Sequence, residues 1–266
     1  MTLLEALILG LIEGITEYLP VSSTGHLLIA QRLLGIPDDA AANAFAIAIQ
    51  AGAIVAVLGI YRARATQMVL GVFGKDSDGL KLVGCLLAAF VPAAIIGGLF
   101  DDKIEQVLFG VKPILIAWVV GGLVILALAK WIERRREGRG LLDLRWQQAV
   151  LIGLIQCVAM WPGTSRSLVT ILGGLLVGLS MAAAVEFAFL LGVVTLGAAT
   201  AYTALKHGDV LLASYGPAVL FAGFAMAWLS AALAVKWMVA WLNKHGLTLF
   251  AWWRFAAAAM AAALLL

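Results

Sequence analysis

The sequence predicts an all-α polytopic membrane protein of two inverted-topology repeats, each with one re-entrant broken-helix hairpin and three transmembrane helices. Three observations support this fold class. The 266 residues are 64% hydrophobic and 12% charged, with a mean hydropathy of +1.04, a composition that no soluble surface has. Six apolar stretches are long enough to cross a bilayer. Two further stretches are interrupted by proline and hydroxyl residues.

Each of the six full spans is an uninterrupted apolar stretch of roughly the 20 residues that a bilayer requires. They cover residues 41–61, 82–100, 111–132, 182–203, 210–235 and 249–266. Because the connections are short, we expect residues 1–266 to form a single integral membrane domain. The net charge of +3 is typical of membrane orientation, so we expect no nucleic-acid partner.

The two interrupted stretches are too short on either side of the break to span a bilayer. Residues 3–19 break at 19–25 and resume to Leu34, and residues 147–161 break at 161–165 and resume through Gly178. Irregular backbone at membrane depth occurs where it is buried in protein or lines a wet cavity, because lipid cannot satisfy its free N–H and C=O groups. A kinked helix is the simpler alternative. The hydroxyls and the histidine after the first break favour two hairpins that point at one cavity.

An internal repeat accompanies the two breaks. Residues 5–13 align without a gap with residues 148–156, and Tyr18, Pro20 and Ser23 then align with residues 161, 162 and 165 if one residue is dropped. We therefore divide the chain into repeat 1, about 1–133, and repeat 2, about 145–266. One hairpin and three spans make an odd number of crossings, which inverts the second repeat.

The distribution of basic residues predicts the orientation. If the arginine-rich segment 133–145 is cytoplasmic, most Lys and Arg residues fall in inside connections, whereas the outside connections contain Lys103, Lys112 and Lys206. Both termini then lie outside. The first hairpin enters from the outer face and the second from the cytoplasm.

Glu13 and Glu17 are the acidic residues of the first hairpin. They are four residues apart, so on a helix they share one face. Two like charges inside a membrane are costly and need a partner. A divalent cation with oxygen ligands, Mg²⁺ or Ca²⁺, would supply it. A protonated carboxyl, or one paired with a helix terminus, is the alternative.

The run from Ser22 to His26 stands where the second arm of this hairpin begins. Its hydroxyls can cap free N–H groups, and the positive end of the helix dipole can receive an anion. We expect Ser22, Thr24 and Gly25 to bind substrate, although capping alone explains one of the hydroxyls. Ser23 is the candidate nucleophile. His26, three residues later, is expected to orient or deprotonate Ser23, or to act on water directly.

The second break provides another hydroxyl-rich helix start, now with an arginine. Arg166 is expected to bind phosphate oxygens, because the guanidinium group suits them, and Thr164, Ser165 and Ser167 to bind substrate. The alternative is a salt bridge from Arg166 to a carboxylate of the first hairpin or to Glu186. Taken together, these groups indicate a site for a phosphate ester or pyrophosphate with a metal.

These residues also carry a resemblance to a known family. The segments from Glu13 to His26 and from Pro162 to Ser167 resemble the two signature motifs of the bacterial undecaprenyl pyrophosphate phosphatase family, the bacitracin-resistance type. The length and the spacing of the motifs also fit, so the resemblance covers essentially the whole chain.

The resemblance implies an activity and a location. It implies hydrolysis of undecaprenyl diphosphate to undecaprenyl phosphate and inorganic phosphate, which recycles the lipid carrier for cell-wall synthesis. A divalent metal is implied as the cofactor, and an isoprenoid diphosphate lipid and membrane lipids as the partners. The implied location is the bacterial inner membrane with the site facing the periplasm. A homodimer is compatible with this description.

Carried over by motif, the family's acidic pair falls on Glu13 and Glu17, its hydroxyl and histidine on Ser23 and His26, and its phosphate-binding arginine on Arg166.

One departure lies in the second motif. Leu168 stands where the family commonly has a small residue, usually glycine, so a change in the packing behind Ser167 is expected.

A transporter or lipid flippase is the alternative function, because inverted repeats with broken helices are also a transporter architecture. Transport without phosphate release would distinguish it. A second class of membrane lipid phosphatase needs a histidine six residues after the motif arginine. Leu172 occupies that position, which excludes that class.

Overall fold

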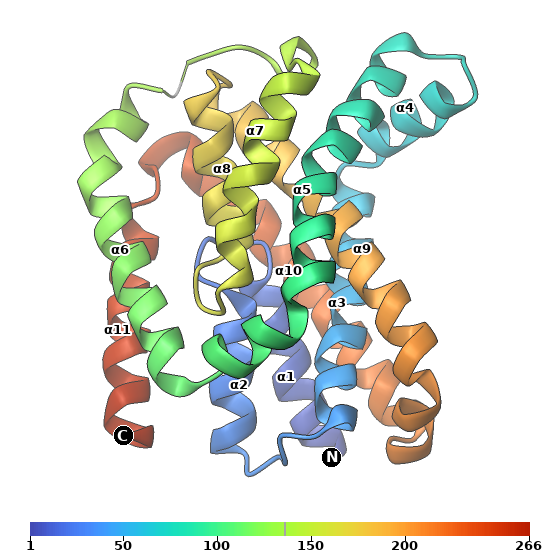
Figure 1. Ribbon diagram of the computed structural model, residues 1–266, viewed down its shortest axis with the longest axis vertical. Coiled ribbons are helices and arrows are strands. Elements are labelled where there is room, and N and C mark those ends of the chain that lie inside the picture. The colour runs from blue at the N-terminus through green and yellow to red at the C-terminus, as the bar shows by residue number, and fades with distance from the viewer. Residues whose placement is uncertain (136) are drawn as a thin grey trace.

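The computed structural model describes residues 1–135 and 137–266 (Figure 1). Arg136, one of the basic residues assigned to the inside, therefore lies outside the described residues, as does the side chain of Lys103. The described part is helical and contains no β-strand, although an isolated bridge pairs Arg139 with Leu179.

Both interrupted stretches form helical hairpins, as expected. The arms of the first are α1 (Leu3–Thr16) and α2 (Ser23–Leu33); those of the second are α7 (Trp146–Gln156), continued by the 3₁₀ turn η2 (Cys157–Met160), and α8 (Arg166–Leu176). The two hairpins enter from opposite ends of the molecule, and their turns meet midway (Figure 1). A proline in each turn cannot donate an N–H group, which prevents either helix from continuing.

The six expected spans are confirmed as helices long and apolar enough to cross a membrane, and the chain is a multi-pass membrane protein. Shorter elements, α4 (Arg62–Val72) and η1 (Leu141–Asp143), lie in connections. The spanning helices are α3 (Ala40–Ile60), α5 (Ser77–Leu108), α6 (Val111–Glu133), α9 (Met181–Ser214), α10 (Pro217–His245) and α11 (Thr248–Leu265).

The expected boundary of the fifth span was wrong. Residues 210–214 form the last turn of α9, and α10 begins at Pro217. Proline favours the first turn of a helix because its fixed φ suits a helix start and its missing N–H costs no bond there. Lys236, assigned from sequence to an inside connection, consequently lies within α10.

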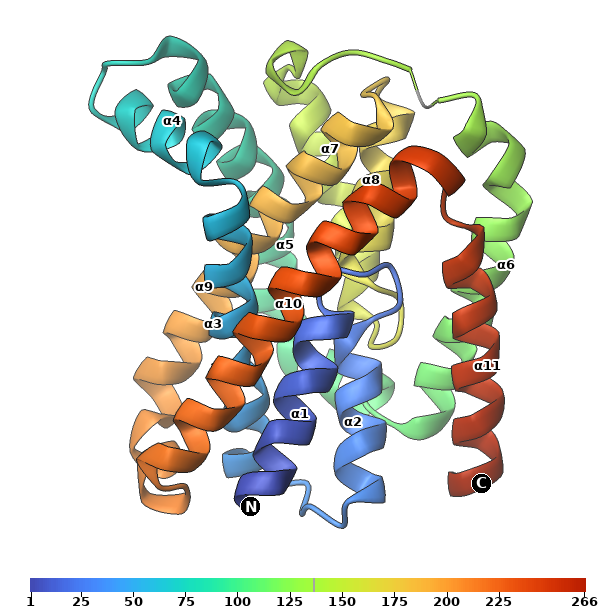
Figure 2. The same cartoon turned by 180° about the vertical axis from the view of Figure 1, so that it is seen from behind.

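Glycines allow the hairpin arms to pack closely against spanning helices. A Cβ atom at Gly153 on α7 would stand 2.8 Å from the carbonyl carbon of Ala89 on α5, and one at Gly14 on α1 would stand 2.8 Å from the backbone nitrogen of Ala231 on α10. Small residues at such crossings are typical of membrane helices. At one edge of the molecule α11 lies beside α6 (Figures 1 and 2).

Candidate functional site

The two hairpin turns share an unusual backbone conformation. Ser22 has φ 73° and ψ 102°, and Ser165 has φ 75° and ψ 110°. Such a conformation costs a non-glycine residue roughly 1–3 kcal/mol and is found mainly at functional sites. Each serine is the N-cap of its second arm and accepts from the backbone N–H three residues later. The shared geometry pairs Ser22, rather than Ser23, with Ser165, an offset of 165 − 22 = 143.

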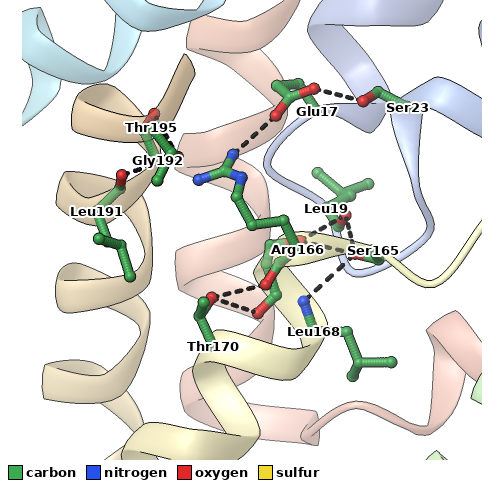
Figure 3. A network of polar contacts seen from close by, with 11 residues as sticks. Glu17, Leu19, Ser23, Ser165, Arg166, Leu168, Thr170, Leu191, Gly192 and Thr195 are labelled. Atoms are coloured by element: carbon green, nitrogen blue, oxygen red, sulfur yellow. Dashed lines mark hydrogen bonds and ion pairs between the residues drawn. The ribbon is translucent and has the colours of Figure 1, made fainter. Parts of the chain in front are cut away.

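Serine side chains also join the two turns to each other. Ser22 Oγ accepts from Gly163 N at 3.2 Å, while Ser167 Oγ and Ser165 Oγ donate to Leu19 O at 2.9 and 3.4 Å. The bond from Ser165 to Leu19 is drawn in Figure 3. The three serines expected to bind substrate are therefore buried and bonded to the opposite hairpin's backbone. Their role as substrate ligands stays a prediction.

Glu17 connects the candidate nucleophile to the arginine of the other hairpin (Figure 3). Arg166 NH2 donates to Glu17 Oε1 at 2.7 Å, and Ser23 Oγ donates to Glu17 Oε2. The ion pair of Arg166 with a carboxylate of the first hairpin is thus present, and the role of Arg166 in binding phosphate stays a prediction. Glu186 instead bonds Arg64 Nε at 2.8 Å.

The guanidinium group of Arg166 is enclosed by neighbouring residues, but not all of its nitrogens have a hydrogen-bond partner. It lies 5.6 Å from the centroid of the Tyr18 ring, within the range of a cation–π interaction. A Cβ atom at Gly192 on α9 would stand 2.7 Å from Arg166 Cζ, so only glycine leaves room for the group. Among the described residues, Nε and NH1 of Arg166 are buried without a hydrogen-bond partner. Two donors are therefore available to an anion.

Glu13 is fully buried, and neither of its carboxylate oxygens has a hydrogen-bond partner in the described part of the chain. An unpaired buried carboxylate is costly and suits a hard cation. Among the described residues, no three or more His, Cys, Asp or Glu side chains form a group that could hold a metal ion by themselves. The unpaired oxygens of Glu13 therefore suit a cation, whereas both oxygens of Glu17 already have partners in Arg166 and Ser23.

His26 does not contact Ser23 as expected from their spacing. Its Nδ1 lies 2.7 Å from Ser22 O, and its Nε2 accepts from Trp253 Nε1 at 3.0 Å. Because Nε2 accepts, Nδ1 carries the proton and donates to the carbonyl. The Trp118 ring packs on the imidazole with centroids 4.6 Å apart. Glu17, and not His26, hydrogen-bonds Ser23 in this structure, so the expected contact of His26 with Ser23 is not seen, and the direct action of His26 on water stays a prediction.

The remaining predicted substrate residues lie at the same turns. Thr24 and Thr164 are half-buried, and a Cβ atom at Gly25 would stand 2.9 Å from Trp118 Cζ2. The Leu168 side chain is 2% exposed in the apolar core. It fills the space behind the second turn, where sequence had indicated altered packing.

Arg254 is a site residue that sequence reasoning missed. The sequence indicated a basic residue within the last apolar stretch, yet the structure buries Arg254 completely and brings its guanidinium group to the backbone of both turns. An arginine deep in an apolar span was the available signal, because such residues are costly and commonly functional.

The arrangement suits chemistry on a phosphate group. The N-termini of α2 and α8 meet at the turns, and helix N-termini favour anions. The unpaired donors of Arg166 lie beside them, and the hydroxyl of Ser23 already faces a carboxylate. The site therefore combines anion binding with a hydroxyl that has an adjacent base.

A family profile described as "Bacitracin resistance protein BacA" matches residues 6–260 of the chain. The chain belongs to this family. Curated relatives agree with the BacA assignment. An "Undecaprenyl-diphosphatase 2" of Rhodospirillum rubrum is 46% identical over 96% of this chain and 92% of its own length. An "Undecaprenyl-diphosphatase" of Sorangium cellulosum is 42% identical over 96% of this chain and 84% of its own length. An "Undecaprenyl-diphosphatase 1" of Chromobacterium violaceum is 43% identical over 96% of this chain and 93% of its own length.

Proposed function

We propose that this BacA-family chain hydrolyses undecaprenyl diphosphate to undecaprenyl phosphate and inorganic phosphate, and so recycles the lipid carrier for cell-wall synthesis. The names of its relatives support this activity. The observation that carries it is the contact of Glu17 with both Ser23 and Arg166, where the arginine keeps two unpaired donors. The alternative function, transport or flipping of the lipid, does not require a hydroxyl paired with a base.

The contacts support a role for each group. The donors of Arg166 bind oxygens of the terminal phosphate and stabilise charge that develops there. Ser23 Oγ attacks the terminal phosphorus as Glu17 accepts its proton, and the anhydride P–O bond breaks to release undecaprenyl phosphate. Water then attacks the phosphoserine phosphorus, the bond between Ser23 Oγ and phosphorus breaks, and inorganic phosphate leaves. The proton of the water passes to Ser23 Oγ, and the proton that Glu17 accepted in the first step leaves with the products. Direct attack by water and attack by His26 are the alternatives. Trapping of a phosphorylated residue would identify Ser23 or His26 as the nucleophile, and finding none would favour water.

A divalent cation, Mg²⁺ or Ca²⁺, is part of the proposal. Glu13 and Glu17 would hold it, which the unpaired carboxylate of Glu13 supports. When bound, the cation neutralises phosphate charge and polarises a P–O bond.

The proposed placement is the bacterial inner membrane, with the site facing the periplasm and both termini outside. The basic residues of the segment 133–145 support the cytoplasmic side of that segment, and the N- and C-termini, which both lie at the end from which α1 and α2 enter, support a shared side for the termini (Figure 1). This arrangement also supports two inverted repeats, about 1–133 and 145–266. Exposed apolar side chains on α5 contact membrane lipids and would accommodate a homodimer.

Phosphate release from undecaprenyl or farnesyl diphosphate by the purified protein in detergent tests the activity. We expect release that EDTA abolishes. Glu17→Gln is expected to lower kcat by about 10²–10⁴-fold, the usual contribution of a general base. Glu186→Gln is the matched control, because it makes the same change in an ion pair outside the site.

No release from folded wild type, together with movement of the lipid across a vesicle membrane, would overturn the proposal in favour of a flippase. Equal losses in Glu17→Gln and Glu186→Gln would show that lost stability, not lost chemistry, lowers the rate.

A further inference from the structure

Arg254 is a fully buried arginine that bonds the backbone of both hairpins. Its Nε donates to Pro20 O at 2.8 Å, its NH1 to Gly163 O at 3.1 Å and its NH2 to Thr164 O at 2.9 Å. Neither of the two ion pairs found among the described residues includes it. A buried charge without a carboxylate partner is costly, so a role in ordering the two turns explains its presence better than general stability does.

The carbonyls that Arg254 binds belong to the segments that carry the reacting groups. Pro20 lies between Glu17 and Ser23 in the chain, and Thr164 lies two residues before Arg166. The other bonds between the turns, apart from the pair of Glu17 and Arg166, are made by neutral serine hydroxyls. Charge-assisted hydrogen bonds are about twice as strong as neutral ones. Arg254 is therefore the strongest link between the turns that is independent of the reacting groups.

Arg254 is held in place from outside the hairpins. It comes from α11, which packs on α6, and the α6 backbone is open to it only because residue 121 is glycine: a Cβ atom there would stand 3.0 Å from Arg254 Cζ. The preceding residue, Trp253, donates to His26 Nε2. One turn of α11 thus contacts both hairpin turns and the site histidine.

We propose that Arg254 is a positioning residue: it holds the two hairpin turns in the register at which Arg166 acts on the same phosphate group as Ser23 and Glu17. The proposal rests on the proposed function for its kinetic readout. Three of the five N–H donors of Arg254 bond carbonyls of the turns and the side chain is fully buried, so the residue acts through the turns and does not bind the substrate itself.

The first test is Arg254→Lys in the full-length protein, assayed below the unfolding temperature of the variant. A lysine ammonium group cannot bridge three carbonyls in the plane that a guanidinium spans. We expect kcat per folded molecule to fall about 10²-fold, the cost of a misplacement of about 1 Å, with KM changed far less. An unchanged kcat with only a lower unfolding temperature would overturn the proposal.

A pair of glycine variants perturbs the contact without removing the arginine. Gly121→Ala pushes directly on Arg254, whereas Gly122→Ala, the matched control on the same helix, would place a Cβ atom 2.6 Å from Phe255 Cε1. Both crowd the contact between α6 and α11. We expect kcat to fall only in Gly121→Ala, and equal losses in the two variants would contradict the proposal.

A double-mutant cycle separates positioning from stability. If Arg254 aligns Arg166, then Arg166→Lys costs much less activity in the Arg254→Lys background than in wild type. A merely structural arginine leaves the two losses additive, which would overturn the proposal.

A distance measurement keeps the proposal testable if wild type releases no phosphate. Spin labels at Leu33→Cys on α2 and Leu176→Cys on α8, both exposed positions, are attached after Cys85 and Cys157 are replaced by alanine. We expect a narrow distribution of distances that broadens in Arg254→Lys. An unchanged distribution would overturn the positioning role, whereas inactive wild type with a broadened one would overturn only the proposed function.

Discussion

Glu17 and Arg166 neutralise each other across two hairpins that enter from opposite ends, and this pair defines the resting site. Their contact is 2.7 Å, and the two side chains are 4% and 13% exposed. Breaking a buried pair by removing one partner is strongly destabilising, because an uncompensated charge remains. In the proposed reaction, an arriving phosphate would give Arg166 a second anionic partner. The ion pair therefore compensates both buried charges in this structure.

Gly192 determines whether the Arg166 guanidinium can occupy its place. Gly192→Ala is expected to lower kcat/KM by about 10²-fold, because a methyl group there displaces the guanidinium by a distance of order 1 Å. Gly197→Ala on the same helix α9 is the control, since a Cβ atom there meets nothing within 4 Å. Phosphate release at saturating and limiting lipid measures both. Full activity of Gly192→Ala would contradict the role given to Arg166.

Glu13 is expected to link the metal to stability. Without metal, Glu13→Gln removes a buried carboxyl group whose oxygens have no hydrogen-bond partner among the described residues, so we expect the variant to unfold at a higher temperature than wild type in EDTA. Mg²⁺ should then raise the unfolding temperature of wild type and not that of the variant. Glu5→Gln on the same helix is the control, because glutamine retains the capping bond to Thr2 N. Equal stabilisation of all three proteins by Mg²⁺ would place the metal elsewhere.

At the scale of elements, the hairpins are short helices whose turns are strained and whose arms pack closely. Ser22 and Ser165 hold positive φ values because hydrogen bonds from the opposite turn compensate the strain. Each arm is too short to cross the membrane alone, so contacts with the spanning helices fix its position. The site is thus only as rigid as the packing of α1 on α10 and of α7 on α5.

The packing of α7 on α5 predicts the effect of a single methyl group. Gly153→Ala is expected to destabilise the protein by about 1–3 kcal/mol, because its Cβ atom would meet the Ala89 backbone rather than a movable side chain. Gly84→Ala on α5 faces open space and should be neutral or stabilising by about 0.5–1 kcal/mol through helix propensity. Unfolding monitored in detergent compares the two. A neutral Gly153→Ala would show that α7 is not held in this register.

The two ends of the whole molecule differ in their content of basic residues, and each hairpin enters from a different end. The connections at the end from which α7 and α8 enter include α4 and the arginine-rich segment 133–145, while both termini lie at the other end (Figure 1). This asymmetry is the basis for the proposed orientation.

Labelling of single cysteines tests that orientation in cells. With Cys85 and Cys157 replaced by alanine, Lys206→Cys is expected to react with a membrane-impermeant maleimide in intact cells. Glu137→Cys, also exposed, should react only after permeabilisation. The reverse pattern would place the α1–α2 hairpin at the cytoplasmic face.

The sequence by itself determined the membrane class, the six spans, both hairpins and most of the site. Composition and span length are set by the bilayer, and a proline with hydroxyl residues in a short apolar stretch has few stable solutions besides a buried turn. The boundary of α10 was missed because the expected span ran through residues 214–217, although Gly216 followed by Pro217 is a signal for a helix start.

Only the tertiary structure decided which partners the site residues choose. Sequence spacing placed His26 next to Ser23, yet Ser23 donates its hydrogen bond to Glu17. The histidine instead accepts a hydrogen bond from Trp253, which is more than two hundred residues away in the chain. Gly192 has no local pattern that marks it, and the position of Arg254 in an apolar span marks it as unusual without naming its partners, because the roles of both arise from the approach of distant helices. Local physics sets which backbone segments form and where they break, whereas hydrogen-bond partners in a buried site depend on distances that exist only after the helices pack.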